Sequence, residues 1–403
     1  MRIVISYCEY RKFLYLYKLN VPKPKPMSVE IKEVKTRREL RRFVNFPEKL
    51  YRHNEYYVPY LEFDQIDTLD PKSNPAAEFC DYKLYMAYKD GEEVGRVAAI
   101  VNHKNNEQWN HKQVRFDWID FIDDREVSAA LMEKVEEFGR QYGMEEVVGP
   151  LGFTDMDPEG TLIEGFGRES TMPQIYNAPY YAEHLEALGF GKDADWLEFR
   201  AQVPDKLPEK IERIAKIVME RNNLHVRQIN RKIVRKEDYA HKIFALDNET
   251  YKHLYNVTEL PMEAADRYLG FYLSILDLRY ITCIENEAGE LVGFGITMPS
   301  LARALKKSRG KIFPFGWWYL LHDLFIKHSE GAELLLIGVR PDYQNLGVNA
   351  VLIADIFHKF QKMGVKWVES NGELETNVKV QKQFEAFNPD WCKRRRAYIK
   401  KLD

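Results

Sequence analysis

Hydrophobic and polar residues follow one pattern twice along the chain. In the first half, this pattern predicts a hairpin, a third strand, an amphipathic helix and a fourth strand, at residues 84–88, 93–101, 113–122, 128–142 and 146–148. Asp90-Gly91 supplies the turn of the hairpin, and Gly143 ends the helix. The first half therefore has the pattern of an independent mixed domain.

The same order returns in the second half. A hairpin is predicted over residues 280–284 and 291–296, with its turn at Ala288-Gly289. Residues 334–337 form an apolar run typical of a buried strand, and apolar residues at helical spacing then lead to Gly364. Three strands, a helix and a further strand produce a mixed sheet with a crossover helix. The predicted fold class is α/β (an α+β mixed sheet), in two tandem domains that are each a mixed sheet flanked by helices.

Prolines mark the boundary between the two halves. Val203-Pro204 and Leu207-Pro208 interrupt the pattern, and residues 209–220 predict a helix that bridges the halves. We therefore expect a first domain over residues 27–205 and a second domain over residues 206–403.

Composition and charge narrow the class of protein. The chain has 403 residues, of which 45% are hydrophobic and 30% are charged, so it is long for one domain and can bury a large core. Lys and Arg number 59 against 62 Asp and Glu, for a formal net charge of -3. Because there is no basic excess, we expect no nucleic-acid partner.

The cysteines and the apolar runs predict a cytoplasmic location. The four cysteines, which are Cys8, Cys80, Cys283 and Cys392, form no C-x-x-C pair, so neither a disulfide framework nor a zinc site is expected. No apolar run reaches the roughly 18 to 20 residues that span a bilayer. Charged residues also interrupt the first stretch, which makes a poor signal peptide. Residues 1–26 contain Pro-Lys-Pro-Lys-Pro, and we expect them to be a loose extension or to lie outside the native protein.

The most specific segment follows the buried strand at residues 334–337. Pro341 and Asp342 break that strand, and Gly347 then precedes the helix. Backbone N–H groups at the start of a helix favour a phosphate or diphosphate, and a glycine lets the main chain approach it closely. An ordinary strand-to-helix turn is the alternative interpretation of this loop.

Gln344-x-x-Gly347 after a strand resembles the acyl-CoA loop of the GNAT acyltransferases, which usually has the form Gln/Arg-x-x-Gly-x-Gly/Ala. Asn377 heads a later stretch, as in the family's Asn-led helix. Two positions depart from the family pattern. Asn349 stands where Gly or Ala is usual, and Phe384 stands where many members carry a Tyr thought to protonate the leaving thiolate.

The resemblance implies a co-substrate and a set of site residues. The co-substrate is acetyl-CoA or a longer acyl-CoA, the acceptor is an amine, and no prosthetic group is implied. Through its place in the Asn-led helix, Asn377 is implied to be a catalytic residue. The implied donor-binding residues are Val339, Gln344, Asn345, Leu346, Gly347, Val348 and Asn349.

Residues 27–403 as a whole resemble a bacterial tandem-GNAT family. The segments that carry this resemblance are Asn74-Pro75, residues 96–100, 105–107, 149–153, 164–166, 176–181 and 375–377. The chain is also loosely similar to the GNAT-type bacterial ceramide synthases, which move a long acyl chain onto a sphingoid base. This similarity implies an acceptor that is either a small amine or a lipid-like amine.

The first half differs from the second at its own strand-to-helix loop. Residues 123–126 contain no glycine and place acidic side chains where a phosphate would lie. We infer that the first half keeps the fold but does not bind coenzyme A. Tyr180 and Tyr181 follow in a family-like segment, and either core packing or a role in a site explains them.

Amide formation from a thioester needs a neutral amine, but an alkylamine has a pKa of about 10 and is mostly protonated at neutral pH. A carboxylate acting as general base removes that proton. The candidates are Glu369 and Glu259, although an ordinary surface role is open for both. A backbone N–H near Val339 is the candidate for stabilising the charge on the thioester oxygen. Tyr343 and Tyr398 are possible proton donors, and the histidines form no ligand cluster that favours a metal.

An insertion separates the second hairpin from the strand at residues 334–337. Residues 301–311 are rich in Lys and Arg, and residues 312–321 are rich in aromatic residues. Such a segment is typical of a membrane interface or of an acyl tunnel, and it predicts peripheral contact with a membrane. The alternative is that Trp317, Trp318 and Leu321 pack between the two domains.

Three functions fit these features. The first is an acyl-CoA-dependent N-acyltransferase whose second half binds the donor. The second is a GNAT-fold protein that has lost its chemistry and senses coenzyme A or acts as a scaffold. The third is a Fem-like transferase that uses aminoacyl-tRNA, against which the near-neutral charge argues.

Overall fold

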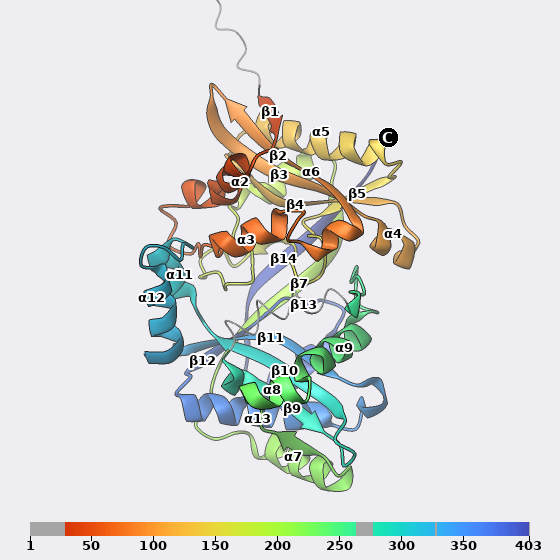
Figure 1. Cartoon of the computed structure of the whole chain (residues 1–403), viewed down its shortest axis with the longest axis vertical. Helices are drawn as coiled ribbons and strands as arrows, with labels where there is room; N and C mark the ends of the chain where they lie inside the picture. The colour runs from red at the N-terminus through yellow and green to blue at the C-terminus, as the bar shows by residue number, and fades with distance from the viewer. Residues whose placement is uncertain (1–28, 263–276, 327–328, 403) are drawn as a thin grey trace, which may run out of the picture.

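A computed structural model describes residues 29–262, 277–326 and 329–402. The extension predicted over residues 1–26, together with Cys8 and His328, lies outside the described residues. Within them, strands pair in one continuous mixed sheet, in the order β1-β2-β3-β4-β5-β14-β7-β12-β11-β10-β9-β8 (Figure 1). Helices cover this sheet, so the predicted mixed α/β class is confirmed.

The elements up to residue 202 form the first half. Its strands are β1 (Glu30–Glu33), β2 (Cys80–Lys89), β3 (Glu92–Asn102), β4 (Gln113–Phe121), β5 (Glu146–Gly149), β6 (Thr161–Glu164) and β7 (Gly191–Gln202). Its helices are α2 (Arg37–Leu50), α3 (Glu62–Leu69), α4 (His103–Trp109), α5 (Arg125–Gln141) and α6 (Tyr180–Ala187).

The second half contains the remaining elements. Its strands are β8 (His225–Arg227), β9 (Ile281–Glu285), β10 (Leu291–Pro299), β11 (Gly331–Val339), β12 (Trp367–Ser370), β13 (Glu373–Leu374) and β14 (Asp390–Lys401). Its helices are α7 (Glu209–Arg221), α8 (Arg231–Lys236), α9 (Tyr239–Tyr251), α11 (Ala302–Ser308), α12 (Gly316–Leu321), α13 (Val348–Met363) and α14 (Val378–Phe384).

The two crossover helices follow directly from the spacing of apolar residues. In α13, Leu352, Ile356 and Phe360 recur every four residues and are buried against the sheet. Gly364, with φ of 74°, ends this helix in the left-handed conformation that glycine adopts without strain. The helix α5 buries an equivalent stripe in the core of the first half. Each helix connects two parallel strands, β4 with β5 and β11 with β12.

A bulge occurs at the same place in both halves. On β11 the pairing with β10 steps from Leu334 to Leu336, so Leu335 is an extra residue. On β4 the pairing with β3 steps from Asp117 to Asp120 and leaves Trp118, with φ of 45°, and Ile119 without a paired residue on β3. Bulges commonly turn side chains toward a functional site.

The two halves share their central strands. The last strand, β14, lies between β5 and β7, where Tyr398 pairs with Gly149. In turn, β7 pairs with β12, where Arg200 lies opposite Glu369. Figure 1 shows β14 and β7 running between the upper and lower halves. The division at residue 205 remains a prediction, and the hydrogen-bonded sheet does not break there.

Candidate functional site

The loop between β11 and α13 presents backbone donors at the start of a helix. Gly347 has φ of 86° and Asn345 has φ of 65°, so the chain turns sharply just before α13. The N–H groups of Asn345, Gly347, Val348 and Asn349 donate no hydrogen bond within the described part of the chain. Such unpaired donors, together with the positive end of the helix dipole, suit a phosphate group.

Other residues of this loop hold its shape. The Gln344 side chain donates a hydrogen bond to the Val339 carbonyl at 3.1 Å, and Val348 is buried. A Cβ atom on Gly347 would lie 3.0 Å from Val218 of α7, so both the positive φ and the packing of α7 favour glycine there. Leu346 is 44% exposed, so the loop is open to solvent.

The parallel strands β11 and β12 separate just before this loop. They pair only from Gly331 to Leu334, and the Asn371 N–H then donates to the Leu334 carbonyl at 2.9 Å. Beyond that point β11 pairs with β10 alone as far as Val339. Among the described residues, no strand pairs with this edge of β11 from Leu335 to Val339, and we call this unpaired edge the opening beside β11.

Tyr251 of α9 contacts the free edge of β11. Its hydroxyl accepts a hydrogen bond from the Ile337 N–H at 3.2 Å and donates one to the Ile337 carbonyl at 3.1 Å. Burial raises the pKa of the Tyr251 hydroxyl above its usual range, so the hydroxyl stays protonated. A proton donor on α9 therefore contacts β11 at Ile337.

A cavity of about 500 Å³ lies between the two halves, next to the bulge. From the first half it is lined by α3 and by the loop that contains Asp155 and Asp157. From the second half it is lined by α9, by Leu335 and Leu336 of β11, and by Asn371 at the end of β12. The opening beside β11 therefore meets the cavity at the bulge.

Acidic side chains in this cavity have raised pKa values. Burial raises the pKa of Asp64 and Asp155 to about 6, that of Asp157 to about 7 and that of Asp247 to about 8. Asp247 is 6% exposed, and its Oδ1 has no hydrogen-bond partner among the described residues. A carboxyl group with a pKa near the working pH is suited to accept a proton.

Asp247 and Tyr251 are four residues apart on α9 and lie on one face of that helix. Ala240, Ile243 and Phe244 of the same helix also line the cavity. The sequence analysis missed this pair. The available signal was an aspartate within an otherwise apolar helical stripe.

The predicted base Glu369 lies in a buried network of ion pairs across the central strands. Its carboxylate contacts Lys393 of β14 and Arg200 of β7, the latter at 2.7 Å. Glu333 lies opposite it on β11, and neither carboxyl oxygen of Glu333 has a hydrogen-bond partner within the described chain. Burial raises the pKa of Glu333 to about 8. Glu369 is thus neutralised by two cations and is not among the residues that line the cavity.

The other predicted catalytic residues lie on separate elements. Glu259 is exposed, and its backbone N–H donates to Gln108 at 3.2 Å. Asn377 precedes α14 but makes no side-chain cap hydrogen bond there. Phe384, 4% exposed, packs against Phe199 with ring centroids 4.7 Å apart. No hydrogen bond joins Glu369, Glu259 and Asn377 within the described residues, and their catalytic roles remain predictions.

The predicted proton donors also lie elsewhere. The Tyr343 hydroxyl accepts a hydrogen bond from Asn286 at 3.2 Å. Tyr398 of β14 is 1% exposed and packs in the core of the first half. Neither tyrosine is among the residues that line the cavity.

The corresponding place in the first half is closed by its own side chains. Asp124 accepts a hydrogen bond from the Glu126 N–H at 2.9 Å and pairs with Lys89 at 2.6 Å, so an acid already occupies the start of α5. The Tyr181 hydroxyl of α6 accepts from the Phe121 N–H at 3.0 Å. Tyr180 and Tyr181 therefore pack against the end of β4.

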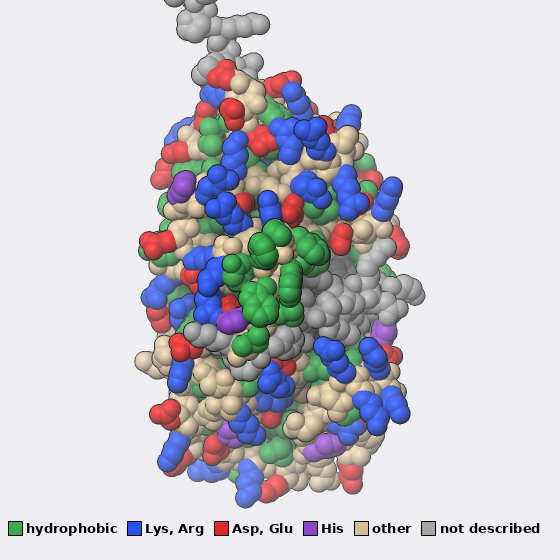
Figure 2. Space-filling view, turned by 60° about the vertical axis from the view of Figure 1, so that its left-hand side comes forward, with side chains coloured by type: hydrophobic (Ala, Val, Ile, Leu, Met, Phe, Trp, Pro, Cys, Tyr) green, Lys and Arg blue, Asp and Glu red, His purple; other side chains and the backbone are tan. Residues whose placement is uncertain are grey.

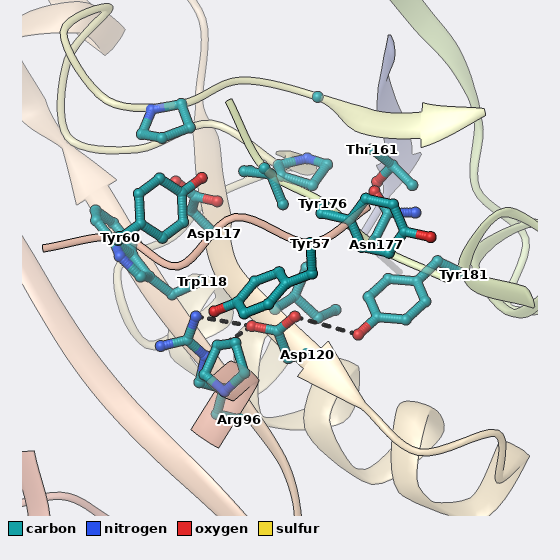
Figure 3. Close-up of a pocket in the computed structure, with 16 residues that line it drawn as sticks. Tyr57, Tyr60, Arg96, Asp117, Trp118, Asp120, Thr161, Tyr176, Asn177 and Tyr181 are labelled. Carbon is teal, nitrogen blue, oxygen red and sulfur yellow. Dashed lines mark hydrogen bonds and ion pairs between the residues drawn. The ribbon is translucent and has the colours of Figure 1, made fainter. Parts of the chain in front are cut away.

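Figure 3 shows the small pocket that remains in the first half. Asp120 pairs with Arg96 at 2.7 Å and accepts from the Tyr181 hydroxyl at 3.3 Å (Figure 3). Tyr57 and Tyr60 also point into it, and its volume is only about 30 Å³. This volume holds about one water molecule, so no substrate fits.

Two further features concern cofactors and membranes. In residues 29–262, 277–326 and 329–402, no three His, Cys, Asp or Glu side chains are arranged to hold a metal ion. Across the same ranges, every helix is too short or too polar to cross a bilayer.

Two curated proteins are similar in sequence to most of this chain. No family model matches the chain. The chain is 28% identical over 373 residues to the protein YghO of Escherichia coli strain K12, which covers 90% of this chain and 93% of that protein. It is 26% identical over 313 residues to a bacterial ceramide synthase of Caulobacter vibrioides, which covers 77% of this chain and 80% of that one.

Solved structures show the fold. A tandem GNAT protein from the clavulanic acid biosynthesis pathway superimposes with a TM-score of 0.56 at 12% identity, over 93% of this chain and 99% of that chain. A GCN5-related N-acetyltransferase from Sphaerobacter thermophilus gives 0.50 at 11% identity, over 93% and 96% of the two chains. The chain therefore has the fold of the tandem GNAT proteins.

Proposed function

We propose that the protein is an N-acyltransferase that moves an acyl group from an acyl-CoA to an amine, and that the amine is lipid-like. The observation that carries this proposal is the loop before α13, where the N–H groups of Asn345, Gly347, Val348 and Asn349 have no hydrogen-bond partner among the described residues. The GNAT fold and the similarity to a bacterial ceramide synthase support it. The predicted cytoplasmic location belongs to the same proposal.

The donor occupies the opening beside β11. Its diphosphate accepts hydrogen bonds at the start of α13, and its pantetheine arm follows the free edge of the strand. From Val339 back to the bulge at Leu335 there are four residue steps, or roughly 13 Å of extended strand. The thioester thus reaches the bulge, where the cavity begins.

The acceptor occupies the cavity. Carboxylates around an apolar space attract an ammonium group, and the apolar lining accommodates a hydrocarbon chain. Asp247 takes the proton from the amine, whose nitrogen then attacks the thioester carbon. The Ile337 N–H stabilises the charge that develops on the carbonyl oxygen.

Tyr251 completes the reaction. As the C–N bond forms and the C–S bond breaks, the Tyr251 hydroxyl gives its proton to the leaving thiolate and regains a proton from Asp247. The Asp247 carboxylate then takes the remaining extra proton from the acylated nitrogen and releases it to water. This movement takes the hydroxyl away from the Ile337 backbone, which frees that N–H for the thioester oxygen. Tyr251 thereby fills the role that the resemblance assigned to a tyrosine at the position of Phe384.

Titration calorimetry with acetyl-CoA and with a long-chain acyl-CoA tests the donor site. In Asn349→Glu, a carboxylate at the second position of α13 repels the diphosphate, and we expect the affinity to fall at least tenfold. The helix itself stays stable, because acids are favourable near a helix N-terminus. Lys210→Glu places an acid at the same position of α7 and should leave the affinity unchanged. If the purified protein shows no affinity for coenzyme A or its esters, the proposal is wrong.

Release of the coenzyme A thiol on addition of a long-chain amine tests the chemistry. The second candidate function, a protein that senses coenzyme A, is favoured by one observation, the contact of Tyr251 with the free edge of β11. Donor binding with no thiol release for any amine would support that alternative.

A further inference from the structure

Large apolar side chains gather on one exposed face of the second half. The aromatic patch consists of Phe313, Phe315, Trp317, Trp318, Leu321 and Ile326, which are 79%, 68%, 44%, 48%, 42% and 62% exposed. Figure 2 shows hydrophobic side chains gathered near the centre of this face, with Lys and Arg side chains around them. A soluble surface rarely exposes so many large apolar groups together unless they bind something.

The exposure contradicts one of the sequence-based alternatives. Trp317, Trp318 and Leu321 do not pack between the two halves, because each has more than two fifths of its surface in solvent. The contact between the halves is made by the other side of this segment, where Leu301 and Leu305 are buried with Leu61 of the first half. The segment is therefore anchored on its inner side and carries its aromatic rings outward.

Basic residues accompany the aromatic patch. The stretch from Ala302 to Lys311 contains five Lys or Arg residues and no acid. Arg303, Lys306 and Arg309 pair with acidic side chains. Lys307 and Lys311 are exposed and form no ion pair with any residue that the structure describes. The charge next to the patch is thus available for an anionic partner.

The apolar core beneath the patch continues to the cavity. Ile312 and Leu320 pack against the cluster that contains Leu61 and Leu305. Leu61, together with Leu335 of the bulge, belongs to this cluster and also lines the cavity. Apolar side chains therefore connect the exposed patch to the proposed acceptor site.

We propose that the aromatic patch inserts into the surface of an anionic phospholipid bilayer, with Lys307 and Lys311 facing the lipid headgroups. Tryptophan and phenylalanine side chains are favourable at the boundary between headgroups and acyl chains. Each lysine near an anionic surface strengthens the attachment. A protein partner would bury the apolar side chains equally well. It would not explain why Lys307 and Lys311 next to them form no ion pair with described residues. The attachment brings the cavity next to the hydrocarbon of the membrane.

Flotation of the full-length protein with vesicles tests this surface. We expect binding to vesicles of phosphatidylglycerol and phosphatidylcholine, and at least tenfold weaker binding to vesicles of phosphatidylcholine alone. Phe313→Ser/Phe315→Ser should weaken binding at least tenfold, because it removes the two most exposed rings. Lys307→Glu/Lys311→Glu should do the same at low salt, since each basic residue contributes about fivefold.

Matched controls lie on α7, at the far end of the second half. Ile217→Ser removes a 52% exposed apolar side chain, and Lys210→Glu/Lys216→Glu makes the same change in net charge. Both should bind vesicles as the unchanged protein does. Asn349→Glu should also bind vesicles, so failure of the donor site is distinguishable from failure of the membrane surface.

Two results would overturn the proposal. One is the absence of vesicle binding, or binding that the patch variants leave unchanged. The other is an oligomer in sedimentation velocity that the patch variants dissociate while vesicle binding is absent. That result would make the aromatic patch an interface between copies of this chain.

Discussion

Asp247 is a carboxyl group held out of water next to the proposed acceptor. Its pKa is raised to about 8, first by burial and then by the charge of Asp155. A general base works in its ionised form, so activity should rise with pH and level off above about 8. At neutral pH only a minor fraction of the protein is then in the active form.

Asp247→Asn should lower kcat by roughly 100-fold or more, because the amide cannot accept the proton. The KM for the acyl-CoA should stay the same, and the rise in activity across pH 8 should disappear. Steady-state thiol release at several pH values measures all three quantities. The matched control Asp205→Asn, on the surface, should keep the full profile. A variant with wild-type kcat would rule Asp247 out as the base.

The same shift has a consequence for stability. A carboxyl group whose pKa is raised in the folded state makes its full contribution to the free energy of unfolding below its unfolded pKa. That contribution is lost as the pH rises through the folded pKa. The free energy of unfolding of the unchanged protein should therefore fall as the pH rises to about 8 and Asp247 ionises. Asp247→Asn removes this dependence on pH. A higher melting temperature of the variant at pH 9 shows that any loss of activity is not a loss of folding.

Tyr251→Phe should lower kcat by roughly 100-fold, because the leaving thiolate loses its proton donor. The affinity for the acyl-CoA should stay the same or increase, since the phenylalanine no longer hydrogen bonds to Ile337. Calorimetry and thiol release separate the two effects. Tyr142→Phe, a change on an exposed tyrosine, is the control. If the variant binds the donor more tightly and keeps its kcat, Tyr251 only blocks the opening.

At the scale of residues, sites whose residues are adjacent in the chain could be predicted from the sequence. Sites whose residues come together only in the folded structure could not. The loop around Gly347 could be predicted because all its parts are adjacent in the chain. Asp155 and Asp247 lie far apart in sequence, and only the packing of the two halves buries them in one cavity. The same limit applies to Glu369. Its strand could be predicted from the sequence, but its ion pairs with β7 and β14 could not.

At the scale of elements, the two copies of the fold differ in what fills the opening after the third strand. Among the described residues of the second half, the Tyr251 hydroxyl forms hydrogen bonds with the Ile337 backbone at this edge of β11. In the first half, α6 closes the equivalent edge with Tyr181, and Asp124 caps the following helix. The two halves have the same order of strands and helices, and they differ in the side chains at this edge.

We therefore expect one acyl-CoA to bind per chain. Titration calorimetry should give a stoichiometry of one, and Asn349→Glu should weaken that single site rather than half of the total binding. Tyr181→Ala should reduce stability by about 3 kcal/mol, as for other large buried rings, and should not create a second site, because Asp124 still repels a phosphate. A stoichiometry of two would contradict the closed first half.

The order of these elements could be predicted from the sequence because each has its own hydrophobic period. The hairpins, the crossover helices and the repeat of the pattern all appear within a few residues of their predicted places. The bulges at Leu335 and Trp118 could not be predicted, since a bulge depends on how two strands pair and not on the composition of either strand.

At the scale of the whole molecule, the exchange of central strands joins the two halves into one folding unit. The last strand, β14, lies between β5 and β7, and removal of β14 would leave both with unpaired edges. Prolines near residue 205 suggested two separable domains. Strand pairing across the boundary is non-local, so the pattern along the chain contains no sign of it.

Thermal unfolding should consequently be a single transition. Calorimetric and van't Hoff enthalpies should agree, as they do for one cooperative unit. A fragment of residues 29–205 should not fold alone, because it lacks the strand between β5 and β7. Circular dichroism of the fragment, with the full chain as its control, checks this expectation. Two separate transitions in the full chain would contradict it.

The place of β14 also has a consequence for biosynthesis. A ribosome makes this central strand after every other strand described here, so the middle of the sheet stays incomplete until translation has passed residue 401. Until then, β5 and β7 are open edges to which other nascent chains can pair. A premature stop late in the message would therefore yield an aggregating polypeptide and not a shortened enzyme.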